Sequence, residues 1–340
     1  MKLLASVLFF IFFSFTSLAR PVFFIGDIHA DVDALKRILI GLKLVDRDLR
    51  WIGGDAELVT LGDHLDRGPN SRPVLDLLMR LESESVVAGG KVTNLIGNHE
   101  FMTADGHYTY AQTSDMLNYR DFKLGTRGSG YERAFIGETI YAQWFRSRPA
   151  MYIVDDTLFV HAGVTEKMLD YSIDEINRMV LDWMRYVQIN AQAQKQNKNI
   201  LSIEPPNPST AWVIQGEGPL WTTNLSYRED TFKREKVNSH MLPVELLDRL
   251  MKHFNVKRIA VGHQPVEDME KAVHHPVYGN RVVSADTGIS TSDNKIVSGF
   301  RLENGIVTGF HFDRRSQALL NTVHSRPIES SNKNLCLSFY

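Results

Sequence analysis

The chain has 340 residues, of which 43% are hydrophobic and 23% are charged, and this balance excludes a largely disordered protein. Its 38 Lys and Arg residues nearly balance its 40 Asp and Glu residues, so the composition indicates neither a nucleic-acid partner nor a polybasic membrane patch. Cys336 is the single cysteine, which excludes a disulfide within the chain.

The first 19 residues have the pattern of an export signal. Lys2 gives a positive start, residues 3–13 form an almost unbroken apolar run, and Ser17 and Ala19 are small residues with the spacing of a cleavage site. The apolar run is short for a membrane span, which needs about 20 residues. We therefore expect cleavage after Ala19, a periplasmic or secreted protein, and no stable membrane association after cleavage.

The following part of the chain predicts alternating strands and helices. Short apolar runs at 21–25, 57–61 and 91–96 are each followed by a glycine, as expected of buried strands. Between them, apolar residues recur at helical spacing, first after Asp31 and then after Pro73. This order predicts a parallel sheet covered by helices, in which ligands bind beyond the carboxyl ends of the strands.

Further strands are expected in the second half of the chain. Apolar runs at 157–160, 257–261 and 281–285 have the length and composition of buried strands. Asn304-Gly305 lies between two apolar runs, which predicts a closing hairpin.

Two long segments separate the predicted strands. Residues 102–149 and 165–251 are rich in helical patterns, and we expect them to be insertions that form the walls of a pocket. The sequence shows no linker that would divide the chain into independent domains. We therefore assign a signal peptide to 1–19, one domain to 20–320 and a C-terminal tail to 321–340.

Five polar segments lie at the ends of the predicted strands. They are Gly-Asp-Ile-His at 26–29, Gly-Asp-His-Leu-Asp-Arg-Gly at 62–68, Gly-Asn-His-Glu at 97–100, His-Ala-Gly at 161–163 and Gly-His-Gln at 262–264. Each alone is a weak signal, because Gly-Asp is common in turns and a buried His is more often a core residue than a ligand. Together they predict one site at a sheet edge, with carboxylate, amide and imidazole ligands that suit Mn, Fe or Zn.

Such a ligand set is suited to the hydrolysis of phosphate esters. Two metal ions about 3.5 to 4 Å apart can share a carboxylate ligand. The pair can polarise a phosphate and also make hydroxide from water near neutral pH.

The five segments resemble those of the calcineurin-like metallophosphoesterases, in particular the phosphoprotein-phosphatase branch with its Gly-Asn-His-Glu segment. Residues 133–135, Trp144, residues 161–164 and residues 218–221 narrow the resemblance to the Shewanella-like protein phosphatases, over roughly residues 22–312. The resemblance implies an α/β fold: a four-layer sandwich of two mixed sheets flanked by helices, here with helical insertions.

The resemblance also implies a role for each motif residue. The implied metal ligands are Asp27 and His29 for a first ion, Asp63 as the bridge, and Asn98, His161 and His263 for a second ion. The implied cofactor is two divalent ions (Mn, Fe or Zn), with Mn the ion expected to support activity in vitro. Arg67 would bind the substrate phosphate through charge-assisted hydrogen bonds from its planar guanidinium, together with Asn98. His99, oriented by Asp66, would protonate the leaving oxygen as general acid.

The sequence departs from the pattern of these relatives at two places. Ala30 replaces the Gly that commonly follows His29, a change that leaves the ligands in place. Thr222-Thr223-Asn224 occupies a position where relatives usually have an Arg, which we associate with substrate contact. A second arginine clamp would therefore have to come from another residue, such as Arg133 or Arg228.

Three further histidines are interpreted as structural. His64 lies inside the second motif, but its position in that motif is variable, which favours a core residue over a metal ligand. His274 and His275 are adjacent in a predicted loop, and adjacent side chains on an extended chain point in opposite directions. We do not expect these two residues to be a ligand pair.

The sequence thus predicts a metal-dependent phosphatase that hydrolyses phosphate monoesters by attack of a hydroxide held by two metal ions. The expected substrates are phosphoproteins carrying phosphotyrosine or phosphoserine/threonine, or small phosphomonoesters. A hydrolase of nucleotides or dinucleoside polyphosphates is an alternative with the same metal core, although an acid at His99 favours the poorer leaving groups of monoesters. A non-catalytic metal-binding protein is a third hypothesis, which is disfavoured because all ligands and the acid are present.

Overall fold

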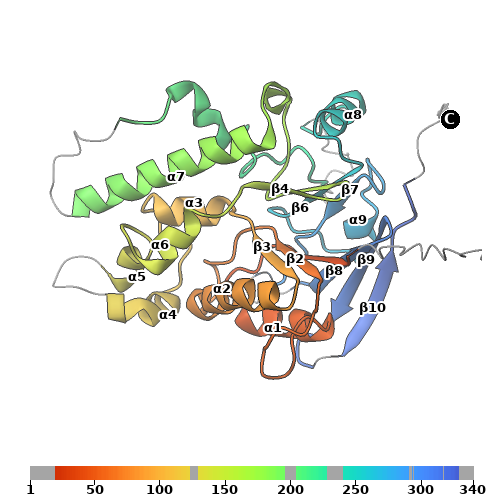
Figure 1. Ribbon diagram of the computed structural model, residues 1–340, viewed down its shortest axis with the longest axis horizontal. Coiled ribbons are helices and arrows are strands. Elements are labelled where there is room, and N and C mark those ends of the chain that lie inside the picture. The colour runs from red at the N-terminus through yellow and green to blue at the C-terminus, as the bar shows by residue number, and fades with distance from the viewer. Residues whose placement is uncertain are drawn as a thin grey trace, which may run out of the picture.

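The computed structural model describes most of the chain between Arg20 and Ile328, namely residues 20–122, 129–195, 204–227, 240–290, 293, 295–316 and 318–328. The predicted signal peptide and Cys336 lie outside these residues. The described chain forms two mixed sheets with helices on their outer faces (Figure 1), which confirms the α/β fold class.

The larger sheet has six strands in the order β10-β9-β8-β1-β2-β3. They are β1 (Val22–Ile25), β2 (Glu57–Thr60), β3 (Lys91–Asn94), β8 (Val297–Glu303), β9 (Ile306–Phe312) and β10 (Leu319–His324). The first three are parallel and the last three antiparallel. Asn304 and Gly305 connect β8 to β9 at positive φ, as the hairpin prediction requires. Because β10 crosses residue 320, the sheet extends into the region that the sequence analysis assigned to the tail.

The smaller sheet has four strands in the order β4-β5-β6-β7. They are β4 (Met151–Val154), β5 (Thr157–Val160), β6 (Arg258–Val261) and β7 (Val282–Ser284). The last three are parallel and coincide with the predicted strands, whereas β4 pairs antiparallel with β5 and was not predicted.

The two sheets pack face to face through apolar side chains. Phe24 of β1 lies between them, with its ring centroid 5.4 Å from that of Phe159 on β5 and 5.0 Å from that of Phe300 on β8. Burying each such ring contributes about 2 to 3 kcal/mol. The strands at this interface are buried on both faces, which is why their sequences read as continuous apolar runs without alternation.

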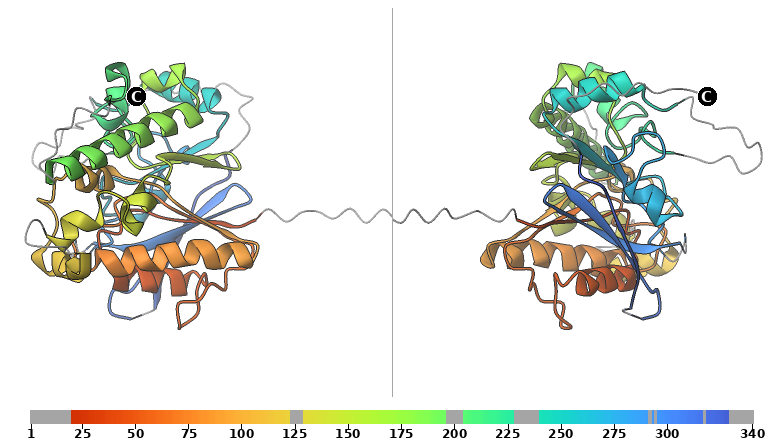
Figure 2. Two further views of the ribbon diagram at one scale, coloured as in Figure 1. Left: turned by 60° about the vertical axis from the view of Figure 1, so that its left-hand side comes forward. Right: turned by 90° about the vertical axis from the view of Figure 1, so that its right-hand side faces the viewer.

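Helices cover the outer face of each sheet and complete four layers. α1 (Val32–Gly41) and α2 (Ser71–Val87) lie on the larger sheet, and α7 (Ile173–Lys195) and α8 (Val244–His253) lie on the far side of the smaller one (Figure 2). The side chain of Asp31 caps α1 by accepting the N–H of Ala34 at 2.9 Å. Pro73 lies in the first turn of α2, where a helix does not need its N–H.

The insertions are helical, as predicted. The first contains α3 (Asn98–Ala104), α4 (Thr113–Met116), η1 (Leu117–Phe122), α5 (Gly130–Ala134) and α6 (Ile140–Phe145). The second contains η2 (Glu166–Asp170), α7, η3 (Pro208–Ile214) and the first part of α8, and α9 (Met269–Val273) follows β6. Within the described ranges, no helix combines the length and hydropathy that a membrane span requires.

Candidate active site

The residues predicted as metal ligands lie together at strand ends from both sheets. Three strands of the larger sheet and two of the smaller sheet supply them: Asp27 and His29 after β1, Asp63 after β2, Asn98 after β3, His161 after β5 and His263 after β6. The prediction that these residues meet at the edge of a single sheet is therefore wrong. Five of the six residues are no more than 3% exposed, and His263 is partly exposed.

Asp63 belongs to two groups of side chains that could hold a metal ion. The first group is His29, Asp63 and His99, in which the Nε2 atoms of the two histidines lie 3.7 and 3.8 Å from Oδ2 of Asp63. Nδ1 of His29 donates to the carbonyl of Leu65 at 3.1 Å. This hydrogen bond leaves Nε2 of His29 available as a ligand.

The second group is Asp63, His161 and His263. Nε2 of His161 lies 3.5 Å from Oδ1 of Asp63, and its Nδ1 donates to the carbonyl of Leu61 at 2.8 Å. Oδ1 of Asn98 lies 2.8 Å from Nε2 of His161 and 3.1 Å from Nδ1 of His263, so the amide oxygen faces the same space. Because Asp63 presents one oxygen to each group, its carboxylate has the arrangement of a bridge between two ions.

The charge states of the histidines suit metal binding. Burial lowers the pKa of both His29 and His263 to about 3, because it disfavours the imidazolium form. Both rings are therefore neutral near pH 7 and can donate a lone pair to a metal ion. Neutral imidazoles combined with carboxylate and amide oxygens form a donor set that fits Mn²⁺, Fe²⁺ or Zn²⁺.

Asp27 lies beside the two groups without belonging to either. Its carboxylate accepts the backbone N–H of His263 at 3.0 and 3.1 Å and lies 3.9 Å from Nε2 of His29. Burial, followed by the negative charges of Asp286 and Asp63, raises the pKa of Asp27 well above its usual value. A cation in this position would offset that repulsion, so the surroundings of Asp27 also fit a metal site.

Asp286 is a buried carboxylate of the site that the sequence analysis missed. It lies two residues after the end of β7, and its Oδ1 accepts the N–H of Gly288 at 2.9 Å. Its position immediately after the strand predicted at 281–285 is the same signal that identified the other site residues.

The turns that carry the site residues have strained backbones. Six non-glycine residues of these turns have φ between 45° and 69°: His29, Ala30, Asp63, Asp66, Arg67 and His263. Such a conformation costs on the order of 1 to 3 kcal/mol per residue and clusters at functional sites. Ala30 is at φ 56°, a conformation that Gly would adopt without strain.

Two glycines allow the strand ends to approach the ligands. A Cβ atom at Gly97 would lie 2.2 Å from Oδ1 of Asp63, and one at Gly262 would lie 2.4 Å from Oδ1 of Asp27. Both distances are far below van der Waals contact, so any larger residue would displace a ligand.

His99 is held in position by two other side chains. Its Nδ1 lies 2.8 Å from Oδ2 of Asp66, and the hydroxyl of Tyr131 donates to Oδ1 of Asp66 at 3.1 Å. Burial lowers the pKa of His99, but the charges of Asp63 and Asp66 outweigh this effect, so the net shift is upward. His99 therefore carries a proton more readily than an ordinary histidine. Tyr131 comes from α5 in the first insertion and was not predicted.

Arg67 lies at the edge of the site with a third of its side chain exposed. Its Nη1 is 3.6 Å from Oδ1 of Asp293. The backbone N–H of Arg67 donates to the carbonyl of Tyr110 at 2.8 Å, and its carbonyl accepts from the side chain of Gln112. The first insertion thus fixes the backbone of Arg67, while its guanidinium contacts a carboxylate that a phosphate could replace.

Two aromatic side chains lie next to the ligands. The ring of Tyr110 is 5.0 Å from that of His99, and this residue is 51% exposed. The ring of Trp221 is 6.2 Å from that of His263. Both residues belong to the insertions, and the motifs gave no signal for Tyr110.

Glu100 connects the second and third motifs. Its carboxylate accepts the backbone N–H groups of Asp63, His64 and Gly97 at 2.7 to 2.9 Å. Nδ1 of His64 lies 3.1 Å from the same carboxylate, and its Nε2 lies 2.6 Å from Oγ1 of Thr60. His64 is fully buried and belongs to neither ligand group, which agrees with its interpretation as a core residue.

The other residues that the sequence analysis discussed lie elsewhere. Nδ1 of His274 is 2.8 Å from Oδ1 of Asn280, whereas Nδ1 of His275 accepts the N–H of Tyr278 at 3.2 Å, so the two histidines have separate structural partners. Arg133 lies on α5, and Arg228 is outside the described residues.

Comparison with known proteins connects this geometry to a family. Residues 20–267 match the family model for calcineurin-like phosphoesterases. The chain belongs to the calcineurin-like phosphoesterase family.

Among its relatives, Shewanella-like protein phosphatase 1 of Plasmodium berghei is 26% identical over 272 residues, covering 79% of this chain and 67% of that protein. Shewanella-like protein phosphatase 2 of Arabidopsis thaliana is 29% identical over 197 residues, covering 47% of this chain and 50% of that protein. The chain therefore spans about half the length of the Arabidopsis relative. These relatives confirm the resemblance found in the sequence, and together with the family match they support a metal-dependent phosphatase.

A solved structure shows the same fold. The cold-active protein-tyrosine phosphatase of a psychrophilic Shewanella species superposes with a TM-score of 0.70 at 23% identity, covering 90% of this chain and 80% of the other. This likeness confirms the calcineurin-like architecture of two mixed sheets with flanking helices.

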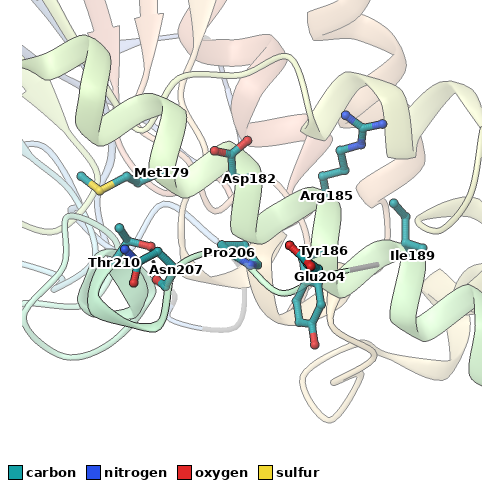
Figure 3. Close-up of a pocket in the computed structure, with 9 residues that line it drawn as sticks. All are labelled: Met179, Asp182, Arg185, Tyr186, Ile189, Glu204, Pro206, Asn207 and Thr210. Atoms are coloured by element: carbon teal, nitrogen blue, oxygen red, sulfur yellow. Dashed lines mark hydrogen bonds between the residues drawn. The ribbon is translucent and has the colours of Figure 1, made fainter. Parts of the chain in front are cut away.

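A separate cavity of about 410 Å³ lies between α7 and the segment leading into η3 (Figure 3). Met179, Tyr186 and Ile189 of α7 line it together with Glu204 and Pro206. None of its lining residues belongs to the five motifs, so this cavity is distinct from the site of this calcineurin-like phosphatase.

Proposed function

We propose that the protein is an exported phosphatase that hydrolyses phosphate monoesters on phosphorylated proteins, with phosphotyrosine preferred over phosphoserine and phosphothreonine. The observation that supports this proposal is the arrangement around Asp63. Two ligand groups share its carboxylate, and the acid candidate His99 lies in contact with it. Arg67, which follows Asp66 in the same turn, supplies the cation for a phosphate.

The residues that would hold the two divalent ions are Asp27, His29 and Asp63 for one ion, and Asp63, Asn98, His161 and His263 for the other. When bound, such ions polarise the phosphate and lower the pKa of water so that a nucleophile forms near neutral pH. Mn²⁺ is the ion that we propose for activity in vitro.

The protein's own side chains supply positioning and a proton. Arg67 presents a planar guanidinium that can form two hydrogen bonds to phosphate oxygens, and the amide of Asn98 faces the same site. Because Nδ1 of His99 is engaged by Asp66, the proton available for transfer is on Nε2. As the bond from phosphorus to the leaving oxygen breaks, this proton moves to the leaving oxygen, while the water oxygen forms the new bond to phosphorus.

The preference for phosphotyrosine rests on Tyr110. Its half-exposed ring lies beside His99, where the leaving group must be located to receive a proton. An aryl leaving group could pack against this ring, and aromatic pairs contribute about 0.5 to 1.5 kcal/mol beyond area burial. The Shewanella protein with the same fold is a protein-tyrosine phosphatase, which supports the same substrate class.

Export is proposed on the basis of the first 19 residues, which lie outside the described structure. The test is the N-terminal sequence of the protein purified from its native host. Arg20 as the first residue supports export with cleavage, whereas retention of Met1 contradicts it.

The substrate proposal is tested by a hydrolysis panel in Mn²⁺ that contains a phosphotyrosine peptide, a phosphoserine peptide, nucleotides and diadenosine polyphosphate. We expect the highest kcat/KM for the phosphotyrosine peptide. Faster hydrolysis of the nucleotides or of diadenosine polyphosphate would instead assign the same site to a nucleotide hydrolase. No hydrolysis of any compound by metal-loaded protein would contradict a catalytic role.

A further inference from the structure

A second cavity, of about 410 Å³, lies on the surface beside α1 and is lined by an excess of cations. Three separate segments form it: α1, the loop at 46–50, and the turn between β9 and β10. Its charged lining residues are Lys36, Arg37, Arg47 and Arg315 against a single carboxylate, Asp33. This excess is local, because the whole chain has a net charge of −2.

Two of these four cations, Arg37 and Arg47, have no carboxylate partner among the described residues. Asp33 lies 3.5 Å from Nζ of Lys36, and it is the only carboxylate among the lining residues. Within the described parts of the chain, the side chains of Arg37 and Arg47 form neither a hydrogen bond nor an ion pair. Several other arginines do have such a partner, since Arg50, Arg146 and Arg281 lie 2.6 to 3.0 Å from a carboxylate oxygen.

The loops that carry two of the arginines are ordered by their own carboxylates. Oδ1 of Asp46 accepts the N–H groups of Asp48 and Arg50 at 2.9 Å, which fixes the loop of Arg47. Oδ1 of Asp313 accepts the N–H of Arg315 at 2.9 Å and thereby fixes the turn of Arg315. Both carboxylates hold backbone groups. Hydrogen bonds from Ser316 lower the pKa of Asp313, and the nearby charge of Arg315 lowers it further, so Arg315 also interacts with this carboxylate. The guanidinium groups of Arg37 and Arg47 remain available to a ligand.

Arg315 and its neighbour Arg314 make different contacts. Nη2 of Arg314 donates to the carbonyl of Ile289 at 2.7 Å, and its Nη1 lies 3.4 Å from Oδ2 of Asp31, the residue that caps α1. Arg314 therefore stabilises the contact between this turn and the start of α1. Arg315 lines the cavity instead.

The cavity also has an apolar part, because Ile40 and Leu49 line it and pack partly against the core. Planar guanidinium groups form paired hydrogen bonds with tetrahedral oxyanions, and three of them can bind more than one such group. We propose that this cavity binds an organic polyanion with two or more phosphate- or sulfate-type groups, held by Arg37, Arg47 and Arg315 against the apolar surface of Ile40 and Leu49.

This site is distinct from the proposed catalytic site. None of its lining residues belongs to the five motifs, and Arg37 is six residues after the cap Asp31, roughly 9 Å along α1 at 1.5 Å per residue. Binding at the cavity therefore does not require the metal ligands. A variant without the carboxylate of Asp63 therefore distinguishes binding at this cavity from binding at the proposed catalytic site.

The experiment is calorimetric titration of the metal-loaded, full-length protein with myo-inositol hexasulfate, a polyanion without a phosphate ester. We expect one molecule bound per chain, with affinity that falls as salt rises. The double variant Arg37→Ala/Arg47→Ala should weaken binding at least 10-fold, because two charge-assisted contacts are lost. Asp63→Asn should bind the probe as the wild type does, whether or not the proposed catalytic function holds.

The matched control is Lys252→Ala, which removes an exposed cation on α8, remote in sequence from the cavity. It should leave the affinity unchanged. A similar loss in this control and in the double variant would show non-specific attraction and overturn the proposal. The absence of binding to the wild type at low salt, or unchanged binding to a folded double variant, would overturn it as well.

Discussion

The residues at the strand ends and the residues that the two insertions contribute to this site differ in how deeply they are buried and how firmly they are held. At the strand ends, Asp63 and His161 are buried to 1% or less exposure. Asp63 forms hydrogen bonds to Glu100 and His99 at 2.9 and 3.0 Å, and His161 donates to the carbonyl of Leu61 at 2.8 Å. In the insertions, Tyr110 is half-exposed. The guanidinium of Arg67, which belongs to a strand-end turn but lies at the edge of the site, is 3.6 Å from Asp293, a long distance for an ion pair. The fold therefore fixes the groups that would perform the chemistry, while the insertions present the groups that would choose the substrate.

This difference has an energetic basis. A ligand at a strand end cannot move without disturbing the packed interface between the two sheets, so its position is precise at the cost of strained φ angles. A wall residue can be changed with only a local effect. Substitutions should accordingly separate into those that abolish turnover and those that change selectivity.

The largest effect is expected for Asp63→Ala, which removes the carboxylate shared by both ligand groups. We expect loss of both metal ions and a decrease in kcat/KM of about 10³-fold or more, since the ions would act on nucleophile and phosphate together. Metal content by mass spectrometry and kcat/KM measure this. A variant that keeps two ions and wild-type activity would contradict the bridging role.

The next effect concerns the proton donor. His99→Asn should decrease turnover of alkyl phosphates by about 10²-fold or more, because an alkoxide leaves poorly without a proton. The loss should be smaller for p-nitrophenyl phosphate, whose leaving group is already stable as an anion. Equal losses on both substrates would indicate that His99 positions the site or binds metal, as its place in the first ligand group also allows.

A wall residue should change selectivity instead. Tyr110→Ala should reduce kcat/KM for a phosphotyrosine peptide by roughly 2- to 10-fold, from the loss of an aromatic contact, and leave a phosphoserine peptide nearly unaffected. Tyr110→Phe retains the ring and serves as the control. If both peptides lose activity equally, Tyr110 acts through Arg67, whose N–H its carbonyl accepts, and not through the substrate.

A smaller effect is expected from changing the ion pair between Arg67 and Asp293. Asp293→Asn should lower KM for small phosphate monoesters by about 2- to 5-fold, because a partly exposed ion pair contributes about 0.2 to 1 kcal/mol and the phosphate no longer competes with it. The value of kcat should change little, since binding improves equally in the ground and transition states. Asp33→Asn, which removes the carboxylate beside Lys36, is the control and should leave KM unchanged.

The smallest effect is expected for Ala30→Gly. Glycine relieves about 1 to 2 kcal/mol of strain at φ 56°, but it also increases the entropy of the unfolded chain and removes a buried methyl group. These contributions nearly cancel, so the free energy of unfolding in urea should change by less than about 1 kcal/mol. A loss above about 2 kcal/mol would show that the methyl group of Ala30 has a packing role that outweighs the strain.

The strand ends could be predicted from sequence because their signals are local. Four of the predicted apolar runs are closed by a glycine and followed by a ligand-type residue, as at Gly26 and Asp27, because the backbone at these ends closely approaches other groups. The capped start of α1 and the hairpin at Asn304 were predictable for the same reason.

Other features of the fold and of the site depend on tertiary contacts, which leave no recognisable pattern in the local sequence. β4 is defined by its antiparallel pairing with β5, and the division of strands between two sheets follows from packing between them. Tyr131 reaches Asp66 from an insertion 65 residues away, so its role could not be read from a motif. Asp286 was missed although its position after a predicted strand was visible in the sequence.

The hydrogen bond between the N–H of His263 and the carboxylate of Asp27 joins residues 236 positions apart. A ribosome that adds about 5 to 20 residues per second needs roughly 12 to 47 s to synthesise the intervening chain. Throughout that time the first turn of the site exists without its partners from the smaller sheet. The catalytic centre of this phosphatase therefore cannot form on the nascent chain until most of the polypeptide has been synthesised.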